Sequence, residues 1–402
     1  MGRLHTWGAS ARRSRPFHVV LAVVVLAVVA GSVVLVRRSA GPPTIPPPPT
    51  ERAVAFGDSV PYGHGLANPY LTPQIGLPVS AVSQGPSPAA YPSLVADDFG
   101  LTMTVRPTNC DLEDDQLSVS GAVASGVDNT SRDGQCPVPP RQARNLSDEL
   151  AASDLVRQPA RLVLLQDGAD DIDFSACLEN QLARVLNVGI GLGTSCVTDG
   201  TVTPTVAGQL ARVRTSLAQA IEMLAPHTAT LAVLDYYQPI PAPGQIAKGT
   251  AASSLHTNLV CSGLKPNAGS TYAAARVVLS ALNAAIAGAV HDARAHHVKN
   301  VTLVDVARTF AGHGICTAHP WVFSGEPVPD ATLAADAEHI VAAKACSGTD
   351  ILHGAAACSA LSTAAKSAER NLQDYVWRAA HPTAAGQRAL AAAVVRQLGG
   401  DS

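Results

Sequence analysis

Short apolar runs alternate with longer segments of helical periodicity along most of this chain. The apolar runs predict strands at residues 53–56, 101–106, 161–165, 229–234 and 300–304. Apolar positions at helical spacing predict helices, at 142–152, 206–224, 272–296 and 386–398. Strands that alternate with helices in this way are typical of a parallel sheet covered by helices. The pattern therefore predicts an α/β, doubly wound domain.

The N-terminal region has a different pattern. Residues 18–36 form an almost continuous apolar segment, with the length of a membrane-spanning helix. Basic residues flank it on both sides and are more numerous before it, which favours a cytoplasmic N-terminus for residues 1–17. We therefore expect an uncleaved transmembrane signal anchor at 18–36. A cleaved signal peptide is the competing interpretation, because Val28-Val29-Ala30 would make a cleavage site.

A proline-rich stretch separates the apolar segment from the rest of the chain. This stretch covers residues 41–50. It lies within a linker predicted at residues 37–51, which should be extended and semi-rigid. No second linker follows, so residues 52–402 are predicted to form one domain placed outside the cytoplasm. The chain has 402 residues and is 47% hydrophobic, enough for one large core. Its net charge of −3 and its 4% aromatic content argue against nucleic-acid binding.

Eight cysteines are spread along the chain without a Cys-x-x-Cys pair, so a zinc site is not expected. An even number of cysteines in an exported protein indicates disulfides. Many pairings are open, and pairing in sequence order is the simplest of them. That order gives Cys110–Cys136, Cys177–Cys196, Cys261–Cys316 and Cys346–Cys358.

Two short motifs carry candidate chemistry. Gly57-Asp58-Ser59 directly follows the first predicted strand, which would place Ser59 on a sharp turn at the edge where α/β sheets bind substrates. A serine hydroxyl needs an adjacent base before it can attack an ester. His381 can serve, since an imidazole accepts and returns a proton near neutral pH. Pro382 suits the first turn of the helix that follows.

Together these motifs resemble the SGNH (GDSL-type) hydrolases over about residues 53–398. Gly57, Asp58, Ser59 and Gly63 match the family's first block, and the His381-Pro382 segment matches its last. Residues 115–122 resemble the second block and 161–174 the third, and residues 310–321 resemble a loop of the secreted actinobacterial lipase–esterase members. The resemblance implies a three-layer α/β/α, flavodoxin-like fold with a five-stranded parallel sheet, and catalysis by Ser59 and His381 without a cofactor or metal.

The resemblance also implies an oxyanion hole, but the third block departs from its pattern. The donors would be the backbone N–H groups of Ser59 and Gly121 and an asparagine side chain, where this chain has Asp170. An ionised carboxylate only accepts hydrogen bonds. Three alternatives are open: Asp170 is kept protonated by a crowded, apolar site, another donor takes its role, or the hole has only backbone donors.

The last block departs from the family as well. The family has Asp-x-x-His there, whereas this chain has Arg378 three residues before His381. Arginine cannot accept the imidazole N–H. Either a backbone carbonyl, such as that of Trp377 or Arg378, orients the ring, or Asp374 reaches it. A Ser–His dyad with a backbone carbonyl is the preferred interpretation.

The sequence therefore predicts a monomeric, extracytoplasmic serine esterase or lipase. It would hydrolyse a small-molecule or lipid carboxylic ester through an acyl-enzyme on Ser59, with His381 as general base. A carbohydrate O-acetyl esterase that acts on envelope or plant polysaccharide is the main alternative within enzymes. A catalytically impaired envelope-binding domain is the alternative from another class, and the departures at Asp170 and Arg378 favour it.

Overall fold

The computed structural model describes the core of the predicted hydrolase domain. The described residues are 50–63, 66, 87–103, 155–174, 177, 196–247, 256–324, 327–329 and 380–399. The predicted anchor at 18–36, most of the proline-rich linker and the predicted helix at 142–152 lie outside them. The division of the chain at residue 51 therefore stays a prediction.

A four-stranded sheet runs through this core. It consists of β1 (Thr50–Gly57), β2 (Ala160–Gln166), β5 (Thr228–Leu234) and β7 (Val301–Val304), in the order β1-β2-β5-β7. All neighbouring strands are parallel. On the outer edge of β1, Arg52 of this strand forms a single parallel bridge with Thr102. The bridge stands where a fifth strand was predicted, and residues 104–106 of that prediction lie outside the described residues.

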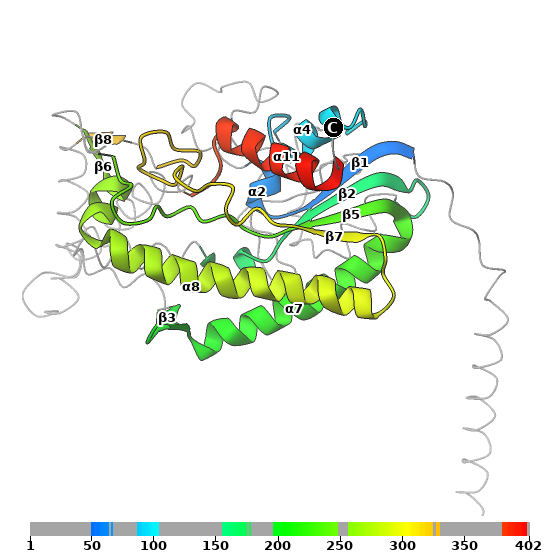
Figure 1. Ribbon diagram of the computed structural model, residues 1–402, viewed down its shortest axis with the longest axis horizontal. Helices are drawn as coiled ribbons and strands as arrows, with labels where there is room; N and C mark the ends of the chain where they lie inside the picture. Colours follow the sequence, from blue (N-terminus) through cyan, green and yellow to red (C-terminus); the bar gives the residue numbers. More distant parts are fainter. Residues whose placement is uncertain are drawn as a thin grey trace, which may run out of the picture. The chain divides into compact units, whose positions relative to one another are not determined.

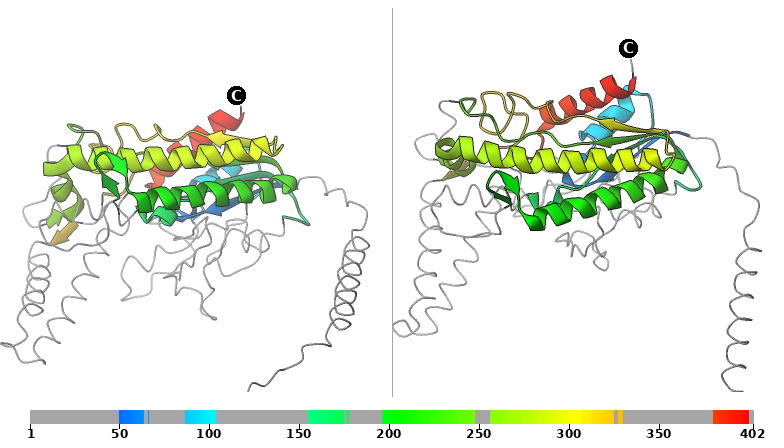
Figure 2. Two further views of the ribbon diagram at one scale, coloured as in Figure 1. Left: turned by 90° about the horizontal axis from the view of Figure 1, so that it is seen from below. Right: turned by 60° about the horizontal axis from the view of Figure 1, so that its bottom comes forward.

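Helices cover both faces of the sheet (Figures 1 and 2). On one face lie α7 (Pro204–Leu224) and α8 (Leu259–Ala295), and on the other α4 (Tyr91–Asp98) and α11 (Ala384–Gly399). The start of α7 follows from its sequence: Pro204 suits a first turn, and the Thr203 side chain accepts a hydrogen bond from the Val206 amide. The predicted α/β fold with a parallel sheet is thus confirmed.

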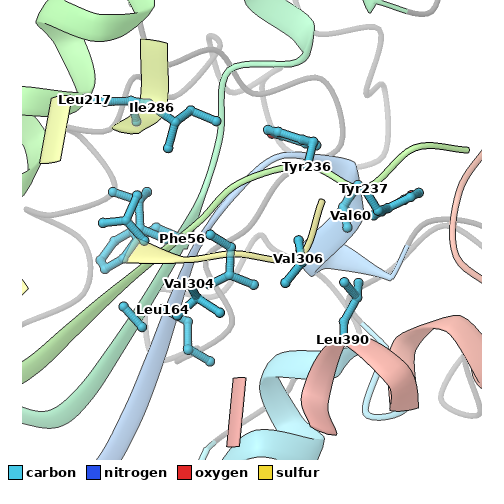
Figure 3. Close-up of a cluster of buried hydrophobic side chains, with 14 of the residues drawn as sticks. Phe56, Val60, Leu164, Leu217, Tyr236, Tyr237, Ile286, Val304, Val306 and Leu390 are labelled. Atoms are coloured by element: carbon cyan, nitrogen blue, oxygen red, sulfur yellow. The ribbon is translucent and has the colours of Figure 1, made fainter. Parts of the chain in front are cut away.

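Apolar strands make the core of this layered arrangement. Because both faces of a parallel sheet are covered, its strands are apolar along their length rather than on alternate residues. Phe56 and Leu164 have no exposed surface, and Val304 of the edge strand has none either. Figure 3 shows these side chains between Leu217 and Ile286 on one face and Leu390 on the other.

The long helix α8 packs in this core over much of its length. Leu282, Ile286 and Ala289 are fully buried. Among the residues that the structure describes, its segment Ala268–Ala295 is the one stretch long and apolar enough to cross a membrane. Its packing on α7 and the sheet is that of a core helix in a globular domain (Figure 2).

Smaller elements and two disulfides complete the described structure. Cys177–Cys196 and Cys261–Cys316 are bonded, as expected from pairing in sequence order. The other four cysteines, Cys110, Cys136, Cys346 and Cys358, lie outside the described residues. The small elements are α2 (Ser59–Tyr62), η1 (Asp170–Ile172), η2 (Ala225–His227), the hairpin of β3 (Val197–Thr198) and β4 (Thr201–Val202), and the antiparallel pair of β6 (His256–Asn258) and β8 (Pro327–Pro329).

Candidate active site

The candidate nucleophile lies on a sharp turn where β1 ends. Gly57 has φ +139°, and a Cβ atom there would lie 1.9 Å from the carbonyl oxygen of Gln166. Only glycine fits, because both the backbone conformation and the close approach to β2 exclude a side chain. The next amide, that of Asp58, donates to the same Gln166 oxygen at 3.1 Å. The turn is therefore tied to the carboxyl end of the neighbouring strand.

Asp58 caps the short helix that carries the serine. Its carboxylate accepts a hydrogen bond from the Val60 amide at 3.0 Å, which is the usual role of an aspartate at a helix N-cap. The side chain has no exposed surface. Ser59 follows as the first residue of α2 and is half-buried. The cap fixes the backbone of Ser59, and so the place from which its side chain projects.

Ser59 and His381 meet in the structure. The distance from His381 Nε2 to Ser59 Oγ is 2.8 Å, although the two residues are 322 positions apart in the sequence. An imidazole nitrogen at this distance from a serine hydroxyl is placed to accept its proton. The two side chains that the sequence motifs singled out therefore form one hydrogen-bonded pair, with the geometry that a nucleophile and its base require.

Backbone hydrogen bonds hold His381 in place from the opposite side. The Phe323 amide donates to the His381 carbonyl at 2.8 Å, and the Ala380 amide donates to the Phe323 carbonyl at 3.0 Å. One residue further on, Pro382 forms an antiparallel bridge with Val322. Residues 321–323 therefore act as a short strand against which the histidine loop pairs.

A buried glutamine links the two halves of the site. Gln387 of α11 has no exposed surface. Its side chain accepts a hydrogen bond from the Tyr91 amide at 2.8 Å and donates one to the Val60 carbonyl at 3.0 Å. The helix that follows His381 is thus bonded to the helix that carries Ser59.

A tyrosine stands behind the serine turn. Tyr236 lies shortly after the end of β5. Its hydroxyl donates a short hydrogen bond to the Asp58 carboxylate. Burial raises the pKa of Asp58 to about 6, although the hydrogen bonds from Tyr236 and the Val60 amide lower it. Burial and then the charge of Asp58 raise the pKa of Tyr236 well above its usual value, so its hydroxyl keeps the proton that it donates.

Of the other residues predicted for the site, the structure describes Asp170. Asp170 is the first residue of η1, in the turn that follows β2. Its charge is among the smaller causes that raise the pKa of Tyr236, after burial and the charges of Asp58 and Asp167. Gly121, Asp374, Trp377 and Arg378 lie outside the described residues. Within the described ranges, no group of three side chains is arranged to hold a metal ion.

Sequence reasoning missed the residues that support the pair. These are Asp235, Tyr236 and Tyr237, which follow β5, and Gln387 of α11. The signal for the first three was available, since polar residues directly after a parallel strand lie at the edge where the serine was expected. Gln387 carries no such signal, because its partners come from distant segments.

Comparisons with known proteins give distant similarities. No family model and no curated protein matches the chain. Among solved structures, a carbohydrate esterase is 13% identical, with 68% of this chain and 61% of that chain covered and a TM-score of 0.32. Two variants of an acetyl-xylooligosaccharide esterase from Geobacillus are 13% and 12% identical, with TM-scores of 0.34. They cover 89% and 88% of this chain, and 97% and 96% of their own.

Proposed function

We propose that this protein is a serine hydrolase of carboxylic esters with the SGNH arrangement of catalytic groups. The single observation that carries the proposal is the 2.8 Å hydrogen bond between Ser59 Oγ and His381 Nε2. Two features support it. The serine stands at the carboxyl end of a parallel strand, where α/β folds place their active sites. The order β1-β2-β5-β7, with Thr102 bridged to the outer side of β1, is that of a flavodoxin-like sheet.

The mechanism is acyl transfer in two halves. Ser59 Oγ attacks the ester carbonyl carbon while His381 Nε2 takes the hydroxyl proton. The tetrahedral intermediate then loses the alcohol, which receives the proton from His381, and an acyl-enzyme remains. In the second half a water molecule gives its proton to His381 and attacks the acyl carbon. The carboxylic acid leaves, and the proton returns to Ser59.

The developing oxyanion needs donors that are fixed in advance. We propose the Ser59 amide as the first of them, because the Asp58 cap and the Gln166 carbonyl hold this turn. The Gly121 amide and Asp170 in its neutral form complete the proposed hole. Asp170 is suited by position, since η1 follows β2, the strand beside β1.

Ester hydrolysis by purified full-length protein tests the proposal. The substrates are chromogenic esters with acyl groups from acetyl to palmitoyl, together with acetylated oligosaccharides. Ser59→Ala and His381→Gln should each lower kcat/KM by about a thousandfold or more. Ser93→Ala is the matched control, because Ser93 is a buried serine of α4 whose hydroxyl bonds, within the part of the chain that the structure describes, to Met103 Sδ at 3.9 Å. A parent protein without hydrolysis, or hydrolysis that survives in Ser59→Ala, would refute the proposal.

The same assay identifies the substrate class. A preference for long acyl chains indicates a lipase, and a preference for short ones a short-chain esterase. Release of acetate from acetylated oligosaccharides indicates a carbohydrate O-acetyl esterase, and binding of envelope material without turnover indicates a binding domain. We further propose that the domain acts outside the cytoplasm, in keeping with the two disulfides among its described residues.

A further inference from the structure

Two consecutive tyrosines contact both halves of the candidate site. Tyr236 and Tyr237 come one residue after the end of β5, and each has only 4% of its surface exposed. The Tyr236 hydroxyl bonds to Asp58, the residue before Ser59. The Tyr237 hydroxyl bonds to the carbonyl of Ala380, the residue before His381, at 2.8 Å. Figure 3 shows the two rings with Val60 of α2, the residue after Ser59.

Tyr236 is held by hydrogen bonds to three segments of the chain. Its backbone is held by Asn283 of α8, which accepts from the Tyr236 amide at 2.9 Å and donates to the Tyr236 carbonyl at 2.8 Å. Its hydroxyl also faces the Ala169 amide, at 3.4 Å. Tyr236 therefore connects the serine turn after β1, the turn after β2 and the helix α8.

The Tyr237 side is anchored by aromatic packing. Its ring stacks on Phe310 with 4.0 Å between ring centroids, and Phe310 packs edge-on against Trp321 at 5.9 Å. The Trp321 carbonyl accepts from the Thr383 amide, two residues after His381. The residue that Tyr237 bonds, Ala380, has φ +70°, a conformation that costs energy for alanine and needs support from its surroundings. Tyr237 supplies part of that support.

We propose that Tyr236 and Tyr237 are positioning residues that together set the distance between Ser59 Oγ and His381 Nε2. The inference rests on the proposed function and deepens it. Because Tyr236 and Tyr237 are adjacent in the chain and Asn283 holds the backbone of Tyr236, a hydroxyl from each fixes the serine turn relative to the histidine loop. Catalysis depends strongly on such spacing, since a displacement of about 1 Å can lower a rate about a hundredfold.

Removal of the hydroxyl groups alone tests the proposal. Tyr236→Phe and Tyr237→Phe in the full-length protein should each lower kcat for a chromogenic ester by about tenfold or more, and leave KM within about twofold. Tyr91→Phe is the matched control. Tyr91 is a fully buried tyrosine whose pKa is raised by burial and then by the charge of Asp58, but its hydroxyl has no hydrogen-bond partner among the described residues. This variant should keep the parent kcat.

A second measurement follows the Ser59–His381 contact directly. The titration of His381 is recorded by NMR with labelled histidine, and its signal is assigned with His381→Gln. Loss of the serine contact in Ser59→Ala should change the His381 signal, and Tyr237→Phe should change it in the same direction. Tyr91→Phe should leave it unchanged. A merely structural role of the tyrosines would lower the melting temperature without this change in the signal.

The outcomes separate the two proposals. If the parent hydrolyses esters and both tyrosine variants keep its kcat and its His381 titration, the positioning role is refuted and the esterase proposal stands. If the parent hydrolyses none, the esterase proposal fails, and the titration still decides whether the tyrosines set the contact. A fall in activity equal to that of Tyr91→Phe would also overturn the positioning role.

Discussion

Asp235 is a buried carboxylate that the proposed reaction does not use. It directly follows β5, with 7% of its surface exposed, and its carboxylate accepts a hydrogen bond from the Val306 amide at 2.6 Å. Burial raises its pKa to about 7, against the hydrogen bond from Val306, which lowers it. A carboxyl group with a raised pKa in the folded state binds its proton more tightly there than in the unfolded chain. Stability is therefore lost as the pH rises through this range.

We expect the free energy of unfolding to fall as the pH rises from about 4 to 7. The pKa of Asp58 is raised to about 6, so this residue contributes to the loss of stability up to about pH 6. The pKa of Asp235 is raised to about 7, so this residue extends the loss to about pH 7. For Asp235 the loss amounts to at most about 4 kcal/mol, because one pKa unit corresponds to about 1.4 kcal/mol. Asp235→Asn should remove the fall between pH 6 and 7. Urea unfolding across this pH range measures it.

The control for this prediction is Asp98→Asn. Asp98 is exposed at the end of α4, so its replacement should leave the pH dependence of the parent unchanged. A free energy of unfolding that is constant, or that rises, between pH 4 and 7 in the parent would contradict the raised pKa values.

At the scale of elements, apolar runs identified the sheet because its strands are buried on both faces. β1, β2 and β5 each contain a predicted run, β7 begins one residue inside its run, and α7 and α11 begin and end within two residues of their predictions. The helix α4 was missed because it has only eight residues, too few to display a period. The start of α8 was missed because residues 259–271 include glycine and proline, which weaken a helical pattern.

The contact of α11 with α2 makes a prediction at this scale. Gln387→Leu leaves the buried Tyr91 amide without its Gln387 partner, which costs about 1–3 kcal/mol, whereas the Val60 carbonyl loses one bond but keeps the one from the Gly63 amide at 3.1 Å. We expect the free energy of unfolding to fall by about 1–3 kcal/mol, as measured by urea denaturation. Activity should fall too, because Val60 follows the nucleophile.

The same helix offers a matched control. Gln397 makes the same two kinds of hydrogen bond, with the amide and the carbonyl of Asp305 at 3.0 and 2.8 Å, but at an exposed position. Water replaces lost bonds there, so Gln397→Leu should change stability by no more than about 0.5 kcal/mol. Equal effects of the two variants would show that the buried link between the helices contributes nothing.

At the scale of the whole molecule, the candidate site joins α2, near the start of the described residues, to the turn before α11, near their end. The motifs around Ser59 and His381 indicated both residues, and the structure brings them together, while their catalytic roles remain a prediction. The sequence places Tyr236 and Tyr237 at the edge of the sheet, but it does not show the groups that Tyr236, Tyr237 and Trp321 bond. These bonds depend on contacts between segments that are more than 60 residues apart, and no local pattern records such contacts.

The Cys261–Cys316 disulfide lies on the route that holds the histidine. It fastens the start of α8 to the segment that runs on to Trp321 and Phe323, against which the His381 loop pairs. The loop it closes spans 55 residues, against 19 for Cys177–Cys196. Loop-closure entropy therefore gives it a stabilisation of about 4 kcal/mol, compared with about 3 kcal/mol for the shorter loop.

Removal of each disulfide in turn should separate stability from positioning. The double variant Cys261→Ser with Cys316→Ser should lose stability and also kcat, by about tenfold, because the segment behind His381 is no longer fastened. The double variant Cys177→Ser with Cys196→Ser should lose a similar amount of stability and keep kcat at temperatures where it stays folded. Thermal unfolding and ester hydrolysis measure the two effects. If both variants keep the parent kcat, backbone pairing alone suffices to hold the histidine, and the disulfide contributes only to stability.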